Sequence, residues 1–133
     1  MGRREQREQI FRLLFRAEFH EPQDMPVQEQ LFFEDEEQLG ISEKDRVYIT
    51  GKFEKIYDRL SELDKLINER TQGWDTTRIG KVELTILRLG IFEILYDEEV
   101  PGGAAINEAV ELAKKYGQES AGGFVNAVLA KFL

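Results

Sequence analysis

The apolar residues of this chain recur at helical spacing, and no stretch alternates apolar and polar residues for long. A period near 3.6 residues is typical of amphipathic helices, whereas strands repeat every two residues. The predicted helices cover residues 3–19, a short acidic segment around 27–32, 42 to about 73, 82–96, 104–116 and a last segment from about 124. We therefore expect an all-α protein, a compact bundle of six to seven helices with short connections.

A capping signal and a regular apolar stripe predict the long third helix. Ser42-Glu43-Lys44-Asp45 resembles a capping box, which satisfies amide groups at a helix start. The apolar positions that follow are spaced 4-3-4-3-4: Ile49, Phe53, Ile56, Leu60, Leu63 and Ile67. This spacing is typical of a narrow seam that packs along another helix. We expect one continuous helix that ends near Gly73.

Glycine and proline residues are expected to separate the later helices. Residues 82–96 are apolar almost all round, as in a central buried helix. Pro101-Gly102-Gly103 precedes the helix over 104–116, and Gly117 follows it as a predicted C′ residue. The pairs Gly102-Gly103 and Gly122-Gly123 lack the lysine and strand of a phosphate-binding loop, so they are interpreted as breaks between helices.

Composition limits the class of protein. A chain of 133 residues that is 41% hydrophobic fits one domain with a substantial core. The sequence contains no cysteine, which excludes disulfides, thiolate metal sites and a catalytic thiol. No apolar run approaches the ~18 residues that span a bilayer. We expect a soluble, cytoplasmic protein with no membrane partner.

The charge is unevenly distributed. The whole chain has a formal net charge of −8, but residues 1–16 carry five arginines and two glutamates, a local charge of +3. Residues 18–45 hold ten acidic residues and one basic residue, Lys44. Diffuse negative charge repels phosphate, so any contact with nucleic acid must be confined to a small patch.

The residues expected of an enzyme or a metal site are missing. His20 is the only histidine and is predicted to be a surface residue. The acidic runs Glu34 to Glu37 and Asp97 to Glu99 lack EF-hand spacing and are typical of a solvated surface. We expect no enzyme, no cofactor and no metal. Three polar residues lie near or within apolar helices: Asn107, Glu108 and Asn126. Helix caps or hydrogen bonds between helices would explain them.

Four stretches together resemble a known family. AINEAVELAKKYG, followed by GFVNAVL, closely resembles the C-terminal signature of the NusB family of transcription antitermination factors. RREQREQIFRLLF resembles the arginine-led first helix of that family, and VELTILRLGIFEIL its central helix. The resemblance covers essentially the whole chain and is strongest from Trp74 to Leu129.

The resemblance implies a single helical domain with two small subdomains, about residues 1–73 and 74–133. It implies a non-enzymatic role, in which the protein binds the boxA element of nascent RNA together with NusE, a protein of the small ribosomal subunit. The pair joins a complex on RNA polymerase that suppresses premature termination, notably in ribosomal RNA operons. Family members occur as monomers and dimers, so a homodimer remains open.

The resemblance also carries over site residues. Arg3, Arg4 and Arg7 match the arginine-rich N-terminus that contacts RNA, a role that suits bidentate phosphate binding and stacking on unpaired bases. The residues that match a second RNA-contacting stretch are Gln118, Ser120 and Gly122. A lysine is common in relatives where this chain has Gly123, which lowers the expected RNA affinity of that stretch.

Phe15 and Glu83 match sites that contact NusE. From the residues alone, a phenylalanine at position 15 is more often a core residue. Two alternatives remain open: a helical protein-interaction module whose arginines do not bind RNA, and a domain of the kind that precedes the catalytic part of some ribosomal RNA cytosine methyltransferases. The chain shows no catalytic domain and no cofactor loop, which argues against the second.

Overall fold

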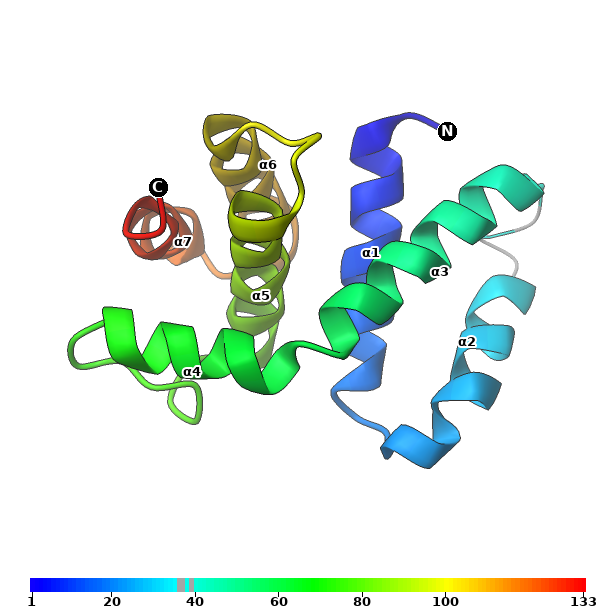
Figure 1. Ribbon diagram of the computed structural model, residues 1–133, viewed down its shortest axis with the longest axis horizontal. Coiled ribbons are helices and arrows are strands. Elements are labelled where there is room, and N and C mark those ends of the chain that lie inside the picture. Colours follow the sequence, from blue (N-terminus) through cyan, green and yellow to red (C-terminus); the bar gives the residue numbers. More distant parts are fainter. Residues whose placement is uncertain (36–37, 39) are drawn as a thin grey trace. The chain divides into compact units, whose positions relative to one another are not determined.

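The computed structural model describes residues 1–35, 38 and 40–133, and in those residues every regular element is a helix (Figure 1). The elements are α1 (Arg3–Ala17), the 3-10 helix η1 (Pro22–Asp24), α2 (Met25–Glu34), α3 (Glu43–Tyr57), α4 (Leu60–Arg70), α5 (Lys81–Tyr96), α6 (Gly102–Tyr116) and α7 (Ala121–Ala130). The prediction of an all-α protein with six to seven helices is confirmed.

The chain forms two compact units, Met1–Tyr57 and Asp58–Leu133. The boundary lies between α3 and α4, whereas the resemblance set it near residue 73. The single long helix predicted from Ser42 is wrong, because the chain turns at Asp58 and Arg59 and restarts with the Leu63 amide donating to the Arg59 carbonyl at 2.9 Å.

The break has a packing cause. The first half of the apolar stripe, on α3, packs against α1, and the second half, on α4, packs against α5. A continuous straight helix would lay the whole stripe along one partner. Interrupting it lets Ile49, Phe53 and Ile56 enter one core while Leu63 and Ile67 enter another, and all five are buried.

In the first unit, α1 packs against α2 and α3. Two contacts tie the helix ends of this unit together. Arg16 Nε on α1 donates a hydrogen bond to Gln28 Oε1 on α2 at 2.8 Å, and the Arg46 guanidinium on α3 lies 4.8 Å from the ring centre of Phe33 on α2, a cation–π contact. The buried apolar side chains are Ile10, Phe11, Leu13, Leu14, Ala17, Met25, Phe32, Phe33, Ile49, Phe53 and Ile56.

In the second unit, α5 packs against α4, α6 and α7 (Figure 1). Its residues from Leu84 to Glu93 are all buried, which agrees with the prediction of a central helix. Gly90 allows α5 to lie close to α7 and α6, because a Cβ atom there would lie 2.8 Å from Leu129 Cδ1 and 3.6 Å from Ala109 Cβ.

The helix boundaries show where local signals succeed and where they fail. The predicted ends at Tyr96 and Tyr116 are observed, and Gly117 follows α6 with extended backbone, φ −93° and ψ −179°. The interpretation of both glycine pairs as breaks is wrong: Gly102-Gly103 and Gly122-Gly123 lie in the first turns of α6 and α7. The first turn tolerates them, since its amides have no intrahelical partner in any case.

Two polar residues of the family signature, Asn107 and Asn126, do not cap their helices. Asn107 and Asn126 are each the sixth residue of their helix and have exposed side chains, so neither is a cap. Glu108 is half-buried.

Candidate functional site

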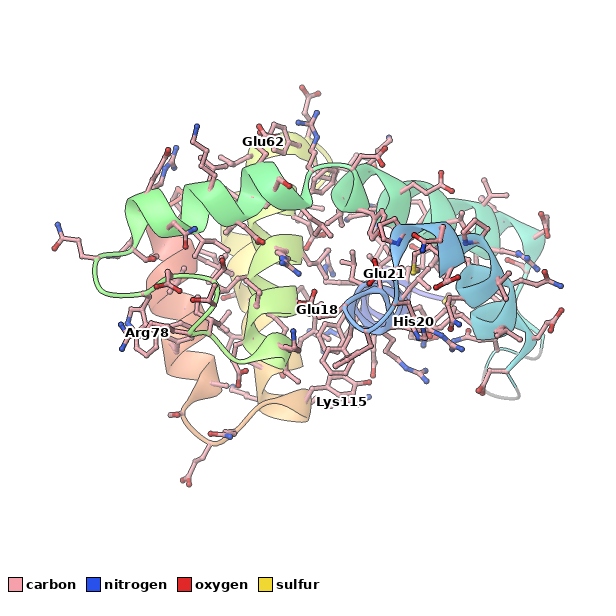
Figure 2. All side chains as sticks on the ribbon, turned by 90° about the horizontal axis from the view of Figure 1, so that it is seen from below. Glu18, His20, Glu21, Glu62, Arg78 and Lys115 are labelled. Carbon is pink, nitrogen blue, oxygen red and sulfur yellow. The ribbon has the colours of Figure 1, made fainter. Side chains whose placement is uncertain are left out.

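A hollow of about 240 Å³ opens in the second unit between the loop that joins α4 to α5 and the start of α7. The residues that line it include some that match the family's RNA-contacting stretch and one that matches its NusE-contacting site. Its lining residues are Trp74, Arg78, Ile79, Gly80, Glu83, Gln118, Ser120, Ala121 and Phe124. Figure 2 shows Arg78 on the loop between α4 and α5.

Two aromatic rings form one wall of the hollow. The rings of Trp74 and Phe124 meet edge to face, with centroids 5.0 Å apart and an interplanar angle of 62°. The edge-to-face arrangement is favourable for aromatic pairs. Trp74 keeps 47% of its surface exposed, so the pair still presents aromatic surface to solvent. Exposed aromatic rings beside cationic groups are the means by which proteins stack unpaired bases.

Hydrogen bonds within the loop hold Trp74 in place. Thr71 Oγ1 lies 2.6 Å from the Ile67 carbonyl oxygen and 2.8 Å from the Trp74 carbonyl oxygen. Between them, Gly73 adopts φ +82°, a conformation that residues with a Cβ rarely take. The backbone at Trp74 is therefore held by the buried end of α4.

A second set of hydrogen bonds shapes the loop before Arg78. Asn68 Oδ1 accepts from the Thr76 amide at 2.9 Å, and Asp75 Oδ1 accepts from the Thr77 amide at 2.9 Å. The Thr77 hydroxyl also donates to Asp75, and these bonds hold the pKa of Asp75 below its usual range. The carboxylate stays ionised and the turn stays closed at neutral pH, which places Arg78 at the rim.

Glu83 lies against two glycines. A Cβ atom on Gly80 would come within 2.6 Å of Glu83 Oε2, and one on Gly117 would lie 3.4 Å from Glu83 Oε1. A Cβ atom on Gly117 would also lie 2.8 Å from the Ala113 carbonyl oxygen and 2.7 Å from Ala121 Cβ. A side chain at position 80 would therefore require the flexible end of Glu83 to shift, whereas one at position 117 would make an ordinary contact with it.

The structure brings together some of the site residues that the sequence suggested. Glu83, Gln118 and Ser120 line the same hollow, although they are expected to serve different partners. Gly122 packs beside α6, where a Cβ atom would lie 3.6 Å from Val110 Cγ1.

Trp74, Arg78 and Phe124 line the hollow but were not predicted as site residues from the sequence. Trp74 lies between the predicted helices over 42–73 and 82–96, and Phe124 lies at the predicted start of the last helix. The available signal was a lone tryptophan among glycine, aspartate and threonine, a setting in which a core residue is unusual.

The N-terminal arginines, in the first unit, are not equivalent. Arg3 and Arg4 lie in the first turn of α1 and are exposed, whereas Arg7 is only 9% exposed and its side chain is largely packed. The basic surface at the start of α1 is therefore dominated by Arg3 and Arg4.

Phe15 belongs to a row of aromatic residues along α1. Its ring lies 6.2 Å from that of Phe11 and 5.1 Å from that of Phe19, centroid to centroid. Phe11 is buried, Phe15 is half-buried and Phe19 is 57% exposed. The row thus leads from the core to the surface at the end of the helix.

The described residues hold no group of three or more His, Asp or Glu side chains that could bind a metal ion. His20 is exposed in the turn that follows α1 (Figure 2). Of the first acidic run, Glu36 and Glu37 lie outside the described residues. None of the helices described is both long and apolar enough to cross a membrane.

Comparison with known proteins gives a consistent result. The sequence model of the NusB family matches residues 4–133. The transcription antitermination protein NusB of Lachnoclostridium phytofermentans is 47% identical over 133 residues, covering 100% of this chain and 99% of the relative. The protein of the same name from Agathobacter rectalis is 45% identical over 132 residues, covering 99% of each.

Solved structures agree with the sequence relatives. T. maritima NusB superposes with a TM-score of 0.84 at 33% identity, covering 99% of this chain and 90% of that chain. A chain from the crystal structure of a plectonemic RNA supercoil superposes with a TM-score of 0.82 at 28% identity, covering 98% of this chain and 92% of that chain.

Proposed function

Since this chain belongs to the NusB family of transcription antitermination factors, which are not enzymes, we propose that it binds boxA RNA together with NusE. The pair acts in the cytoplasm as part of a complex on RNA polymerase that supports transcription of ribosomal RNA. In this proposal the exposed Arg3 and Arg4 contact the RNA backbone, and Arg7 reaches it only through the 9% of its surface that is exposed. The segment with Gln118, Ser120 and Gly122 forms a second RNA contact.

The hollow between the α4–α5 loop and α7 is the observation that carries the proposal. It combines the exposed ring of Trp74, the ring of Phe124 and the cation of Arg78 with the polar side chains of Gln118 and Ser120. Single-stranded RNA is bound by stacking of unpaired bases on aromatic rings and by hydrogen bonds to base edges. The hollow offers both kinds of contact.

NusE binding is assigned to Phe15 and Glu83. Phe15 is half-buried and continues outward into the exposed ring of Phe19, which makes aromatic surface available to a protein partner. Aromatic anchors are common at the centres of protein interfaces. The carboxylate of Glu83 lines the hollow beside Gln118 and Ser120, so RNA and NusE would meet there.

The charge distribution predicts cooperation between the two ligands. With +3 in residues 1–16 and a net charge of −8 overall, the protein has a small basic patch and much repulsive surface. If all three arginines contact phosphates, the logarithm of RNA affinity falls with the logarithm of salt concentration with a slope of about −2. We expect weak binding alone and firm binding with NusE.

The test is titration of boxA RNA with the protein alone and with equimolar NusE, at two salt concentrations. The same titration on an Arg3/Arg4/Arg7→Ala triple variant should show lost RNA binding while NusE association survives. If a folded wild-type protein that engages NusE binds no boxA RNA under any condition, the RNA claim fails and the protein is a helical protein-interaction module. Sedimentation of the protein alone and then with increasing NusE tests whether a homodimer forms and whether it competes with NusE.

A further inference from the structure

The carboxylate of Asp45, in the first turn of α3, joins the starts of two helices. Its Oδ1 accepts a hydrogen bond from Gln6 Nε2 on α1 at 2.8 Å. Its Oδ2 accepts from Ser42 Oγ at 3.0 Å and lies 3.2 Å from the Met1 nitrogen. The Asp45 side chain is only 13% exposed.

The two helix starts differ in how their amides are satisfied. The first turn of α3 is capped within its own sequence, since the Asp45 amide donates to Ser42 Oγ at 3.0 Å. The first turn of α1 has Gly2 as its N-cap, with no side-chain cap hydrogen bond. A side-chain cap exceeds a glycine N-cap by only about a few tenths of a kcal/mol, so the first turn of α1 is slightly less stable than that of α3. The bond from Gln6 to Asp45 is a tertiary contact that holds this turn.

We propose that Asp45 is a positioning residue for RNA binding: by holding Gln6, it fixes the first turn of α1 and so the directions of Arg3 and Arg4. The inference rests on the proposed function, because it assigns Asp45 a role toward the same RNA. Arg3 and Arg4 lie within three residues of Gln6 on the same turn, so any fraying of the turn moves both side chains.

The ionisation of Asp45 supports this role. Hydrogen bonds from Gln6 and then Ser42 hold the pKa of Asp45 below its usual range, so the carboxylate is charged at neutral pH. A charged acceptor makes a stronger hydrogen bond than a neutral one.

For removal of the Asp45 charge, the proposal predicts a change in RNA affinity that is opposite in sign to the change expected from the Coulomb interaction alone. Removing a negative charge near a phosphate-binding surface should strengthen RNA binding if only the Coulomb interaction matters. If Asp45 positions the arginines, removing its charge should weaken binding, because a frayed turn must be ordered when RNA binds.

The experiment is a cycle of three variants with any purification tag placed after Leu133. Asp45→Asn removes the charge from the contact, and Gln6→Glu sets two carboxylates against each other. The double variant Gln6→Glu/Asp45→Asn restores a carboxylate–amide hydrogen bond in reversed direction, with the net charge of the wild type. Glu43→Gln is the matched control, because it removes a charge from an exposed position in the same turn of α3.

Two readouts are measured for each variant: boxA RNA affinity with NusE present, and hydrogen exchange of the residue 6 amide, whose bond to the Gly2 carbonyl at 3.0 Å closes the first turn of α1. We expect about fivefold weaker RNA binding for each single variant and recovery to within about twofold in the double variant. Exchange of this amide should accelerate in the single variants alone. Glu43→Gln should bind RNA as tightly as the wild type or slightly more tightly, with unchanged exchange.

The outcomes separate this inference from the proposed function. If wild-type protein binds no RNA, the proposed function fails, and the role in binding fails with it, while hydrogen exchange still reports whether Asp45 holds the turn. If RNA binds but Asp45→Asn binds as tightly as Glu43→Gln, the inference is overturned and the proposed function stands. Unchanged exchange in Asp45→Asn overturns it as well.

Discussion

The guanidinium of Arg88 on α5 binds both carboxylate oxygens of Asp64 on α4. Arg88 Nε lies 2.8 Å from Oδ1 and Nη2 lies 2.7 Å from Oδ2, a bidentate pair. The side chains of Arg88 and Asp64 are 10% and 25% exposed. This pair therefore fastens α4, the helix that begins the second unit, to its central helix.

The first prediction concerns this pair. Asp64→Ala removes the carboxylate from a guanidinium that stays largely buried, so the free energy of unfolding should fall by about 2–3 kcal/mol, somewhat less than for a fully buried pair. Denaturant unfolding measures it. Glu69→Ala is the control, since the exposed contact between Lys65 and Glu69, at 3.9 Å, should contribute under about 0.5 kcal/mol. Equal losses in the two variants would contradict the prediction.

The second prediction compares two glycines near the hollow. A Cβ atom on Gly117 would lie 2.8 Å from a backbone oxygen, which cannot move without displacing the end of α6. Gly117→Ala should lower the free energy of unfolding by about 1–3 kcal/mol and weaken RNA binding. Gly123→Ala has open space around its Cβ and should be neutral or stabilise α7 by up to about 1 kcal/mol. Thermal unfolding of both variants is the measurement, and an unaffected Gly117→Ala would show that the turn relaxes freely.

The third prediction uses Trp74, the only tryptophan of the chain. If an unpaired base stacks in the hollow, binding of boxA RNA in the presence of a tryptophan-free NusE should quench the indole fluorescence. Trp74→Ala should weaken RNA binding by at least about fivefold, because stacking contributes about 1–3 kcal/mol per base. Trp74→Phe keeps an aromatic face and should retain most of the affinity. An unquenched indole together with wild-type affinity in Trp74→Ala would place the base elsewhere.

The fourth prediction concerns pH and Glu29 on α2. Burial, and then the nearby carboxylate of Glu54, raise the pKa of Glu29 above its ordinary value of 4.5. The folded state therefore holds this proton more tightly than the unfolded chain, and stability falls as pH rises from about 4.5 through the raised pKa. At pH 7 the destabilisation is fully present.

Glu29→Gln should accordingly raise the melting temperature at pH 7, and the gain should vanish near pH 4, where the wild-type carboxyl is also neutral. Glu54→Gln should give a smaller gain in the same direction, because it removes the second cause. Melting curves at the two pH values are sufficient. A gain that is equal at both pH values would mean that the substitution acts through packing and not through charge.

Much of the helical structure was predictable, because helix formation depends on local spacing. The apolar residues that recur along residues 82–96 and 104–116 predicted α5 and α6 to within two residues at each end. The capping signal at Ser42 is also local, and the Asp45 amide does bond to the Ser42 hydroxyl. The sequence motifs likewise identified the family, since a long motif is recognised from the order of its residues without knowledge of the fold.

The break between α3 and α4 was not predictable from the stripe. The apolar positions continue through Ile56, Leu60 and Leu63 at unbroken spacing, so the pattern is the same for one helix as for two. What separates them is that α3 has α1 as its partner and α4 has α5. A sequence pattern records which residues are buried along a helix, but it does not record which partner buries each part.

The site shows the same division. The sequence by itself determined that arginines cluster at the start of the chain. By resemblance to the family it also predicted a NusE contact at Glu83 and an RNA contact at Gln118 and Ser120. Only the tertiary structure decided that Arg7 is packed while Arg3 and Arg4 are exposed, and that Trp74 meets Phe124 across 50 residues of chain. Exposure and long-range contact depend on how helices pack, because burial is set by neighbours that are distant in sequence.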